Sequence, residues 1–103
     1  MNYTVLYDSH KASGSSYRGA LNISYSQLVD VFGEPENGNG DKTQKEWTIE
    51  FEDGKIATIY DWKWCYDGVD YTEVPTWHIG GHDDVVVERI TTIVKEYQTV
   101  TNT

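Results

Sequence analysis

Cysteine, basic side chains and long apolar runs are all scarce in this sequence. The single cysteine, Cys65, has no partner for an internal disulfide, which fits a reducing compartment. No apolar run approaches the roughly 20 residues that a membrane-spanning helix needs. The first residues, MNYTVLYDSHKASGSSYRG, lack the basic and hydrophobic segments of a secretory signal. We therefore expect a cytoplasmic protein without a membrane partner.

Positive charge is also scarce. Eight Lys and Arg residues stand against 17 Asp and Glu residues, which gives a formal net charge of −9 at pH 7. Proteins that bind bare nucleic acid need clustered Lys and Arg to displace counterions from the phosphates. The composition therefore disfavours direct nucleic-acid binding and favours a basic protein partner. An acidic surface that only keeps the protein soluble is the plainer interpretation, and it stays open.

Motifs for catalysis, phosphate binding and metal binding are missing as well. The Gly-rich run Gly33–Gly40 precedes a predicted strand and lacks the Lys-Ser/Thr pair of a phosphate loop. His78 and His82 are separated by Gly80-Gly81, which disfavours a helical pair of metal ligands. Cys65, between two aromatic residues, is expected to be a small hydrophobe and not a nucleophile. We expect no enzyme, no cofactor and no metal, although the many acids leave a weak hydrolase open.

Aromatic residues are plentiful, with four Trp, eight Tyr and two Phe among 103 residues. Each of these side chains can bury a large apolar surface area, so the composition is typical of a folded chain and not of a disordered one. The length supports one compact domain. We predict that this domain spans residues 1–103, with a frayed tail from about residue 99.

The stretch Glu46–Trp62, EWTIEFEDGKIATIYDW, predicts a β-hairpin around which the rest of the chain packs. Asp53-Gly54 favours a two-residue type I′ turn, which pairs Phe51 with Ile56. One face of this hairpin is mostly aromatic and apolar, and we expect it to be buried. It carries Trp47, Ile49, Phe51, Ile56, Thr58, Tyr60 and Trp62.

Two helices are predicted. Ser24, with Gln three residues later, makes a capping box at the start of the first helix, and Gly33 ends it. The second helix begins at Asp83 or Asp84 and runs to about Gln98, with Val and Ile at helical spacing on one side.

Five further segments are predicted to be extended. They are Tyr3–Tyr7 and Arg18–Ile23, the two arms of a loose hairpin, then Trp62–Tyr66, Tyr71–Val74 and Thr76–Ile79. The elements together predict an α+β domain, with a small, largely antiparallel sheet of three to five strands and two helices packed on one face.

Acidic and aromatic residues concentrate between Glu46 and Asp84. Trp and Tyr dominate the binding energy of protein interfaces, and acidic charge steers a basic partner into place. We therefore expect this region to be the contact surface for a partner. The predicted contact residues are Glu46, Glu50, Glu52, Asp53, Asp61, Trp64, Tyr66, Asp67, Asp70 and Tyr71.

A second hypothesis places the aromatic residues around a pocket. The segment Trp62–Trp77 has more large rings than a small core can absorb, so some of them are expected to line a pocket or an exposed patch. Such rings can sandwich the flat base of a nucleotide-like signalling molecule and sequester it. Asp83 and Asp84 would repel its phosphate, so the sequence alone favours the interface. An exposed aromatic strand edge also permits a homodimer.

Three motifs resemble small proteins of uncertain function encoded in bacteriophage genomes. They are KTQKEW, then a strand–DG–strand unit ending IATIYDWK, then TWHIGG before an acid-started helix, and they span about Lys42 to Glu96. The resemblance implies a protein that acts in the host cytoplasm by occluding a defence protein, as nucleic-acid-mimicking anti-CRISPR inhibitors do. It carries no functional residue over. With the acidic charge, it predicts a non-catalytic inhibitor of a basic, nucleic-acid-handling host protein of a CRISPR-like defence.

Overall fold

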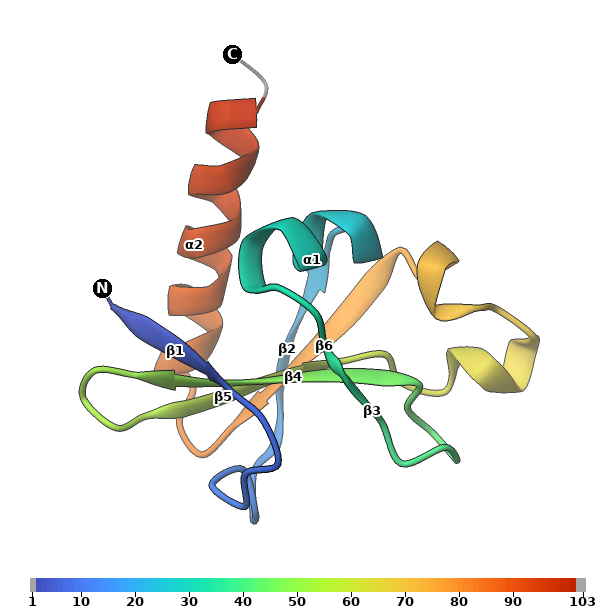
Figure 1. Ribbon diagram of the computed structural model, residues 1–103, viewed down its shortest axis with the longest axis horizontal. Coiled ribbons are helices and arrows are strands. Elements are labelled where there is room, and N and C mark those ends of the chain that lie inside the picture. Colours follow the sequence, from blue (N-terminus) through green and yellow to red (C-terminus); the bar gives the residue numbers. More distant parts are fainter. Residues whose placement is uncertain (1, 102–103) are drawn as a thin grey trace.

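The computed structural model describes residues 2–101 and has an α+β fold (Figure 1). In chain order its elements are β1 (Tyr3–Leu6), β2 (Ser16–Asn22), α1 (Tyr25–Phe32), β3 (Glu36–Asn37), β4 (Lys45–Phe51), β5 (Ile56–Tyr60), the 3₁₀ turns η1 (Trp64–Asp67) and η2 (Tyr71–Glu73), β6 (Thr76–Gly81) and α2 (Val85–Thr101). The predicted α+β class is confirmed, although the sheet of the described residues has six strands instead of three to five.

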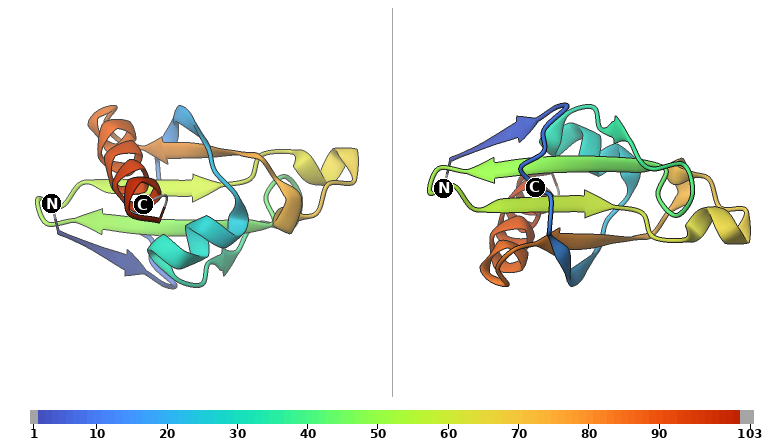
Figure 2. Two further views of the ribbon diagram at one scale, coloured as in Figure 1. Left: turned by 90° about the horizontal axis from the view of Figure 1, so that it is seen from above. Right: turned by 90° about the horizontal axis from the view of Figure 1, so that it is seen from below.

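Every strand pair in the sheet is antiparallel. The spatial order is β1-β4-β5-β6-β2, and the short β3 pairs with β4 beside β1. β1 and β2 therefore occupy opposite edges, and the predicted hairpin between them is wrong, because each pairs with a distant strand instead. Both helices lie over one face, and the loop that joins β1 to β2 crosses the other face (Figure 2). That second face carries no helix.

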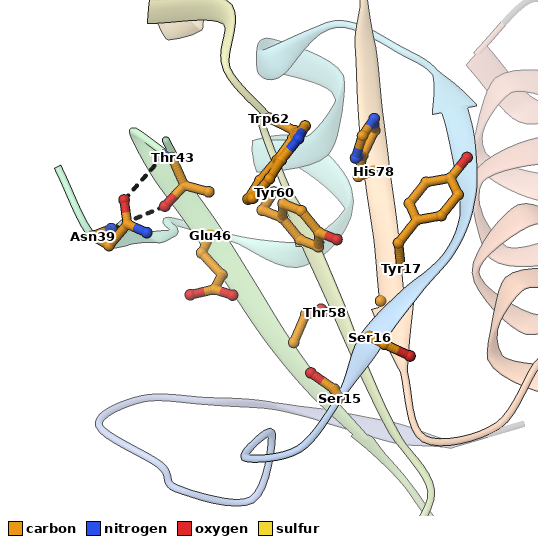
Figure 3. Close-up of a pocket in the computed structure, with 11 residues that line it drawn as sticks. Ser15, Ser16, Tyr17, Asn39, Thr43, Glu46, Thr58, Tyr60, Trp62 and His78 are labelled. Atoms are coloured by element: carbon orange, nitrogen blue, oxygen red, sulfur yellow. Dashed lines mark hydrogen bonds between the residues drawn. The ribbon is translucent and has the colours of Figure 1, made fainter. Parts of the chain in front are cut away.

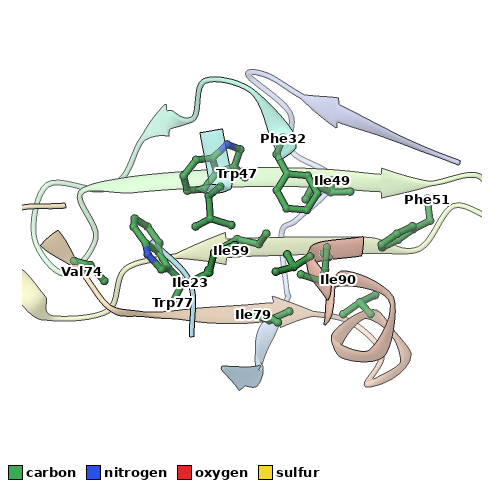
Figure 4. Close-up of a cluster of buried hydrophobic side chains, with 14 residues drawn as sticks. Ile23, Phe32, Trp47, Ile49, Phe51, Ile59, Val74, Trp77, Ile79 and Ile90 are labelled. Atoms are coloured by element: carbon green, nitrogen blue, oxygen red, sulfur yellow. The ribbon is translucent and has the colours of Figure 1, made fainter. Parts of the chain in front are cut away.

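The hydrophobic core fills the space between the helices and the sheet (Figure 4). The helices contribute Leu28, Phe32, Val86, Ile90 and Val94, and the sheet contributes Trp47, Ile49, Phe51, Ala57, Ile59, Trp77 and Ile79. The capping box of α1 is present as predicted, since Ser24 Oγ accepts a hydrogen bond from Gln27 N at 3.3 Å. At the other end, Gly33 adopts a φ of 83° and donates its N–H to Val29 O.

The β4–β5 hairpin forms, but its register is one residue away from the predicted register. The loop is Glu52–Gly54: Phe51 N donates to Lys55 O, and Gly54 N donates to Phe51 O, each at 2.9 Å. Gly54 has a φ of +87°, as in a three-residue loop whose last residue is left-handed. Ile56 therefore lies opposite Glu50 and not Phe51. The predicted type I′ turn is wrong.

This shift reverses the two faces of β5. Ala57 and Ile59 are fully buried under the helices, while Thr58 and Tyr60 point to the helix-free face. The prediction that Tyr60 belongs to the buried stripe is therefore wrong. The observed register keeps the hydroxyl groups of Thr58 and Tyr60 out of the apolar core, where an unpaired hydroxyl costs free energy.

The chain beyond β5 also departs from the predicted strand. Lys63 has a φ of 64°, a left-handed conformation that interrupts an extended chain. Residues Trp64–Asp67 then form η1, and Tyr71–Glu73 form η2 where a strand was predicted. The aromatic side chains of this segment consequently do not line one face of a strand.

The C-terminal helix is longer than predicted. Asp83 Oδ1 accepts a hydrogen bond from Val85 N at 2.9 Å at its start, and the helix continues past Gln98 to Thr101. Much of the predicted frayed tail is therefore helical, and residues 102–103 lie outside the described residues.

Candidate binding pocket

A cavity of about 640 Å³ lies on the helix-free face of the sheet (Figure 3). Alternation along β5 and β6 sends Thr58, Tyr60, His78 and Gly80 to this face. The lining residues, from five separate parts of the chain, are Ser15, Ser16, Tyr17, Asn39, Thr43, Glu46, Thr58, Tyr60, Trp62, His78 and Gly80. We call this cavity the pocket.

Gly80 makes the floor of the pocket. It lies opposite Thr58 on one side and opposite Tyr17 on the other. A Cβ atom at this position would lie 2.5 Å from Thr58 Oγ1 and 3.3 Å from Ser16 O. Any side chain at position 80 would displace these neighbours. Glycine therefore leaves this part of the cavity empty.

Four rings gather at one end of the pocket, and we call them the aromatic cluster: Tyr17, Tyr60, Trp62 and His78. His78 is at its centre, with ring centroids 4.7 Å from Tyr17, 5.6 Å from Tyr60 and 6.4 Å from Trp62. The Trp62 and His78 planes are only 22° apart, whereas Tyr60 meets both edge-on. Partial burial lowers the pKa of His78, which favours the neutral ring.

Glu46 is the acidic group of the pocket. It lies opposite Tyr60 of β5 and opposite Glu36 of β3. Burial, and then the charge of Glu36, raise the pKa of Glu46. Burial and then the Glu46 charge likewise raise the pKa of Tyr60. Glu46 lines the cavity, and among residues 2–101 no side chain or backbone N–H donates a hydrogen bond to its carboxylate.

Basic groups stand at the rim beside Trp62. The Nζ atoms of Lys42 and Lys63 lie 5.5 and 5.7 Å from the Trp62 ring centroid. Neither ammonium group forms an ion pair with a described acid. A smaller hollow of about 230 Å³ continues past Trp62 and His78 toward Lys63 and Thr76. The two rings therefore separate the main hollow, which contains Glu46, from a smaller hollow lined by both Lys63 and Asp67.

The β1–β2 loop closes the pocket on a third side. Lys11 Nζ, in this loop, pairs with Glu50 of β4 at 2.8 Å, and His82 Nε2 contacts Ser13 O at 2.8 Å. These contacts tie the loop across the sheet and bring Ser15 and Ser16 to the cavity wall. On the opposite wall, Thr43 is held by the 38–43 loop. There Asn39 N donates to Thr43 Oγ1, and Thr43 N donates to Asn39 Oδ1.

Comparisons with known protein families, curated proteins and solved structures found no significant match. Within residues 2–101, no group of three His, Cys, Asp or Glu side chains is placed to hold a metal ion. No helix in the same range is both long and apolar enough to cross a bilayer.

The acids predicted as contact residues do not form one surface. Glu50, Glu52 and Asp53 lie at the turn end of the hairpin, while Asp67 and Asp70 lie near η1 and η2 at its far end (Figure 1). Glu50 is paired with Lys11 and Asp53 with Arg89, so their charge is partly neutralised. Glu46 is separated from both groups because it lies in the pocket.

Asp61 is the clear correction among the predicted contact residues. Its side chain is completely buried. Oδ1 accepts hydrogen bonds from Gln44 N at 2.7 Å and Lys45 N at 2.9 Å, and Oδ2 accepts one from Gln44 Nε2 at 2.9 Å. Asp61 therefore fixes the entry to β4, and its buried side chain offers no surface for a partner.

The predicted aromatic contacts are divided as well. Trp64 donates its indole N–H to Thr76 O, and Tyr71 packs on Tyr25. Tyr66 is 58% exposed and hydrogen-bonds Asp41. These rings line no part of the pocket described above.

Tyr17, Tyr60 and His78 were not among the predicted contact residues, although Tyr60 was one of the rings expected to line a pocket or an exposed patch. Their shared position depends on strand order, which no local pattern reveals. The usable signal was the surplus of rings around residues 62–77, which indicated that some rings would stay out of the core.

Proposed function

We propose that this protein is a non-catalytic binding protein that captures a small ligand with a flat aromatic ring, as a sponge that sequesters a nucleotide-like signalling molecule. The Trp62–His78 pair carries the proposal. The rings are nearly parallel, and their centroids are 6.4 Å apart. This is about twice the 3.4 Å spacing of stacked bases, so one flat ring fits between them after a small side-chain adjustment.

The size and exposure of the pocket support the same function. A cavity of about 640 Å³ lies within the range of small-molecule sites, about 300–1,000 Å³. Trp62 is 38% exposed and Tyr17 is 55% exposed, whereas Trp47 and Trp77 are buried in the core. Large aromatic surfaces left open around a hollow are typical of recognition sites.

The polar groups of the pocket favour binding over catalysis. Among the described residues, His78 makes no hydrogen bond to Ser15, Ser16 or Glu46. A serine nucleophile needs a base within hydrogen-bond reach, held in turn by a third group. The pocket offers that base no such partner, and the ligand is expected to leave unchanged.

Trp62 fluorescence and calorimetry test the proposal. We expect nucleosides and nucleotides to quench the emission of Trp62, the most exposed of the Trp side chains. Trp62→Ala should weaken binding roughly fivefold to 150-fold, because base–aromatic stacking contributes about 1–3 kcal/mol. Tyr66→Ala, which removes an exposed ring outside the pocket, is the matched control and should bind normally. Equal affinity of Trp62→Ala and the unaltered protein would refute the proposal.

The acidic-interface hypothesis is the second candidate, and exposed residues near η1 favour it. Tyr66, Asp67 and Asp70 are all exposed, and a basic partner would meet a ring framed by two acids there. If the protein is a phage-encoded inhibitor of a host defence protein, it would bind that protein through the end of the hairpin near η1. Asp67→Lys with Asp70→Lys should then weaken capture of the partner and flatten its salt dependence, while Glu52→Lys should not.

A further inference from the structure

We infer that a groove between α2 and β1 binds a helical segment of a basic partner protein, through one apolar side chain flanked by two Lys or Arg residues. The groove is a hollow of about 420 Å³ and lies apart from the pocket, on the side of the sheet that carries the helices. The inference goes beyond the proposed function, because neither surface needs the other. Three observations support it: an uncovered apolar corner of the sheet, two regular rows of side chains on α2, and unpaired acidic charge.

The apolar corner is formed by Tyr3 and Phe51, which lie opposite each other in β1 and β4. α2 packs chiefly on β2, β5 and β6, and α1 covers the other end of β4, where Tyr25 contacts Trp47 (Figure 2). The corner therefore lies beside α2 and not beneath it. The Arg89 guanidinium lies 5.1 Å from the Phe51 ring centroid and covers that ring, so the half-buried Tyr3 is the accessible part of this corner.

α2 borders the groove with two rows of side chains, each with a spacing of four residues. The inner row, which is half-buried, is Val85, Arg89 and Ile93, and the outer row, which is exposed, is Glu88, Thr92 and Glu96. With a rise of about 1.5 Å per residue, the two glutamates are about 12 Å apart along the helix. The outer row thus offers two carboxylates at a fixed separation, with Thr92 between them.

Acidic charge dominates the groove. Among residues 2–101, neither Glu88 nor Glu96 forms an ion pair with a basic side chain. Arg89 is already bound by Asp53, through hydrogen bonds of 2.9 and 2.8 Å, so its charge is compensated. Lys95 lines a neighbouring hollow on the other side of the outer row. A basic segment therefore complements the groove, whereas a second copy of this chain, with a net charge of −9, would set acid against acid.

A partner helix matches the outer row when it carries Lys or Arg at two positions eight residues apart. Both helices have the same rise, so the two basic groups also lie about 12 Å apart and can reach Glu88 and Glu96. An apolar residue midway between them faces Thr92, where it can enter the hollow and contact Tyr3 and Ile93. The carboxylates thus fix the position of the helix, and the apolar side chain supplies most of the affinity.

Three labelled helical peptides of about 20 residues test this pattern by fluorescence anisotropy. The first carries Lys four residues before and four residues after a central Leu, in an Ala- and Gln-rich sequence. The second has Gln in place of the central Leu. The third has both Lys residues moved by two positions, which puts them on the other side of the helix. We expect the first peptide to bind about tenfold more tightly than either of the others.

Paired charge reversals assign the contacts to residues. Glu88→Lys with Glu96→Lys should weaken binding of the first peptide about tenfold, because two attractive contacts become repulsive. Added salt should reduce this difference. Glu34→Lys with Glu73→Lys makes the same change of charge at two exposed acids outside the groove, and this matched control should bind as tightly as the unaltered protein. All four positions are exposed, so both variants are expected to fold, which circular dichroism checks.

Two results would overturn the inference: equal binding of the three peptides, or equal weakening by the two pairs of substitutions. Sedimentation equilibrium tests the other occupant, because a dimer that Glu88→Lys with Glu96→Lys abolishes would assign the groove to a second copy and overturn the inference as well. Trp62→Ala should weaken nucleoside binding and leave the affinity for the first peptide unchanged. Nucleoside binding without peptide binding would overturn only the groove assignment, and the reverse would overturn only the proposed function.

Discussion

Thr48 lies directly opposite Thr58 in the β4–β5 hairpin, with both side chains on the helix-free face of the sheet. This pairing fixes the faces of every residue in β5. Tyr60 is consequently placed beside His78 of β6, where the two rings meet edge-on at 5.6 Å. The pocket exists because of this register.

A pair of cysteines tests the register. Phe51 and Lys55 share a backbone hydrogen bond, so alternation makes Thr48–Thr58 a non-hydrogen-bonded pair, in which side chains come closest. In a Cys65→Ser background, Thr48→Cys with Thr58→Cys should form a disulfide, detected by mass spectrometry and loss of free thiols. A disulfide from Thr48→Cys with Ile59→Cys, the pair opposed in a type I′ hairpin, would contradict the register.

Gly80 should tolerate no side chain while Thr58 is present. Gly80→Ala places a methyl group against Thr58 Oγ1, and overpacking of this kind costs about 1–3 kcal/mol of unfolding free energy. Urea unfolding measures the loss. Adding Thr58→Ala removes the closest atom, so the double variant should be more stable than Gly80→Ala. If the second substitution lowers stability further, the two residues do not compete for the same space.

Asp61 should be among the most sensitive polar positions. Asp61→Ala leaves the buried N–H groups of Gln44 and Lys45 without an acceptor and should cost about 3 kcal/mol or more in urea unfolding. Asp61→Asn keeps an acceptor oxygen for these groups and should cost less. Asp67→Asn, at an exposed acid, is the control and should change stability little. Similar losses at Asp61 and Asp67 would contradict the structural role.

The Asp53–Arg89 pair should make stability depend on pH in the acid range. Arg89 donates two hydrogen bonds to Asp53, at 2.9 and 2.8 Å, and lowers the Asp53 pKa from 3.8 to about 2. The ionised form is thus favoured in the folded state. The stabilisation of the folded state by the Asp53–Arg89 pair is complete above about pH 3.8 and is lost as the pH falls toward 2.

Thermal unfolding between pH 5 and pH 2 measures this contribution. Asp53→Asn should be less stable than the unaltered protein at pH 5, and the difference should narrow at pH 2. Asp67→Asn should follow the unaltered protein over the whole range. If the difference in melting temperature between Asp53→Asn and the unaltered protein stays constant from pH 5 to pH 2, the pair does not titrate as described.

The sequence predicted well those elements whose signals are local. The capping box at Ser24, the Gly33 stop and the antiparallel α+β class all follow from neighbouring residues, and all are present. The predicted hairpin register was wrong because Asp53-Gly54, which favours a two-residue turn, also fits a three-residue loop with a left-handed Gly54. On β5, Ile56 is buried on one face and Ile59 on the other, so no alternation distinguishes the two registers.

The site was less predictable because it depends on distant pairings. Lys63 adopts a left-handed conformation that no local sequence signal predicts. This conformation ends the extended chain, so Trp64 and Tyr66 do not continue the predicted strand. Asp61 looks like a surface acid until the backbone of residues 44–45 is placed against it. Tyr17 and His78 meet only through the β2–β6 pairing.

The placement of β1 and β2 at opposite edges of the sheet has a consequence for the order of folding. β2 has β6 as its sheet neighbour, so it stays unpaired until nearly the whole chain has been synthesised. Sheets built from such distant contacts fold in about milliseconds to seconds, slower than helical proteins of equal size. The β4–β5 hairpin needs no distant segment and can form early. The ring of Tyr17 therefore reaches His78 late in folding. A ribosome-bound chain that still lacks β6 can form the β4–β5 hairpin but cannot form the pocket.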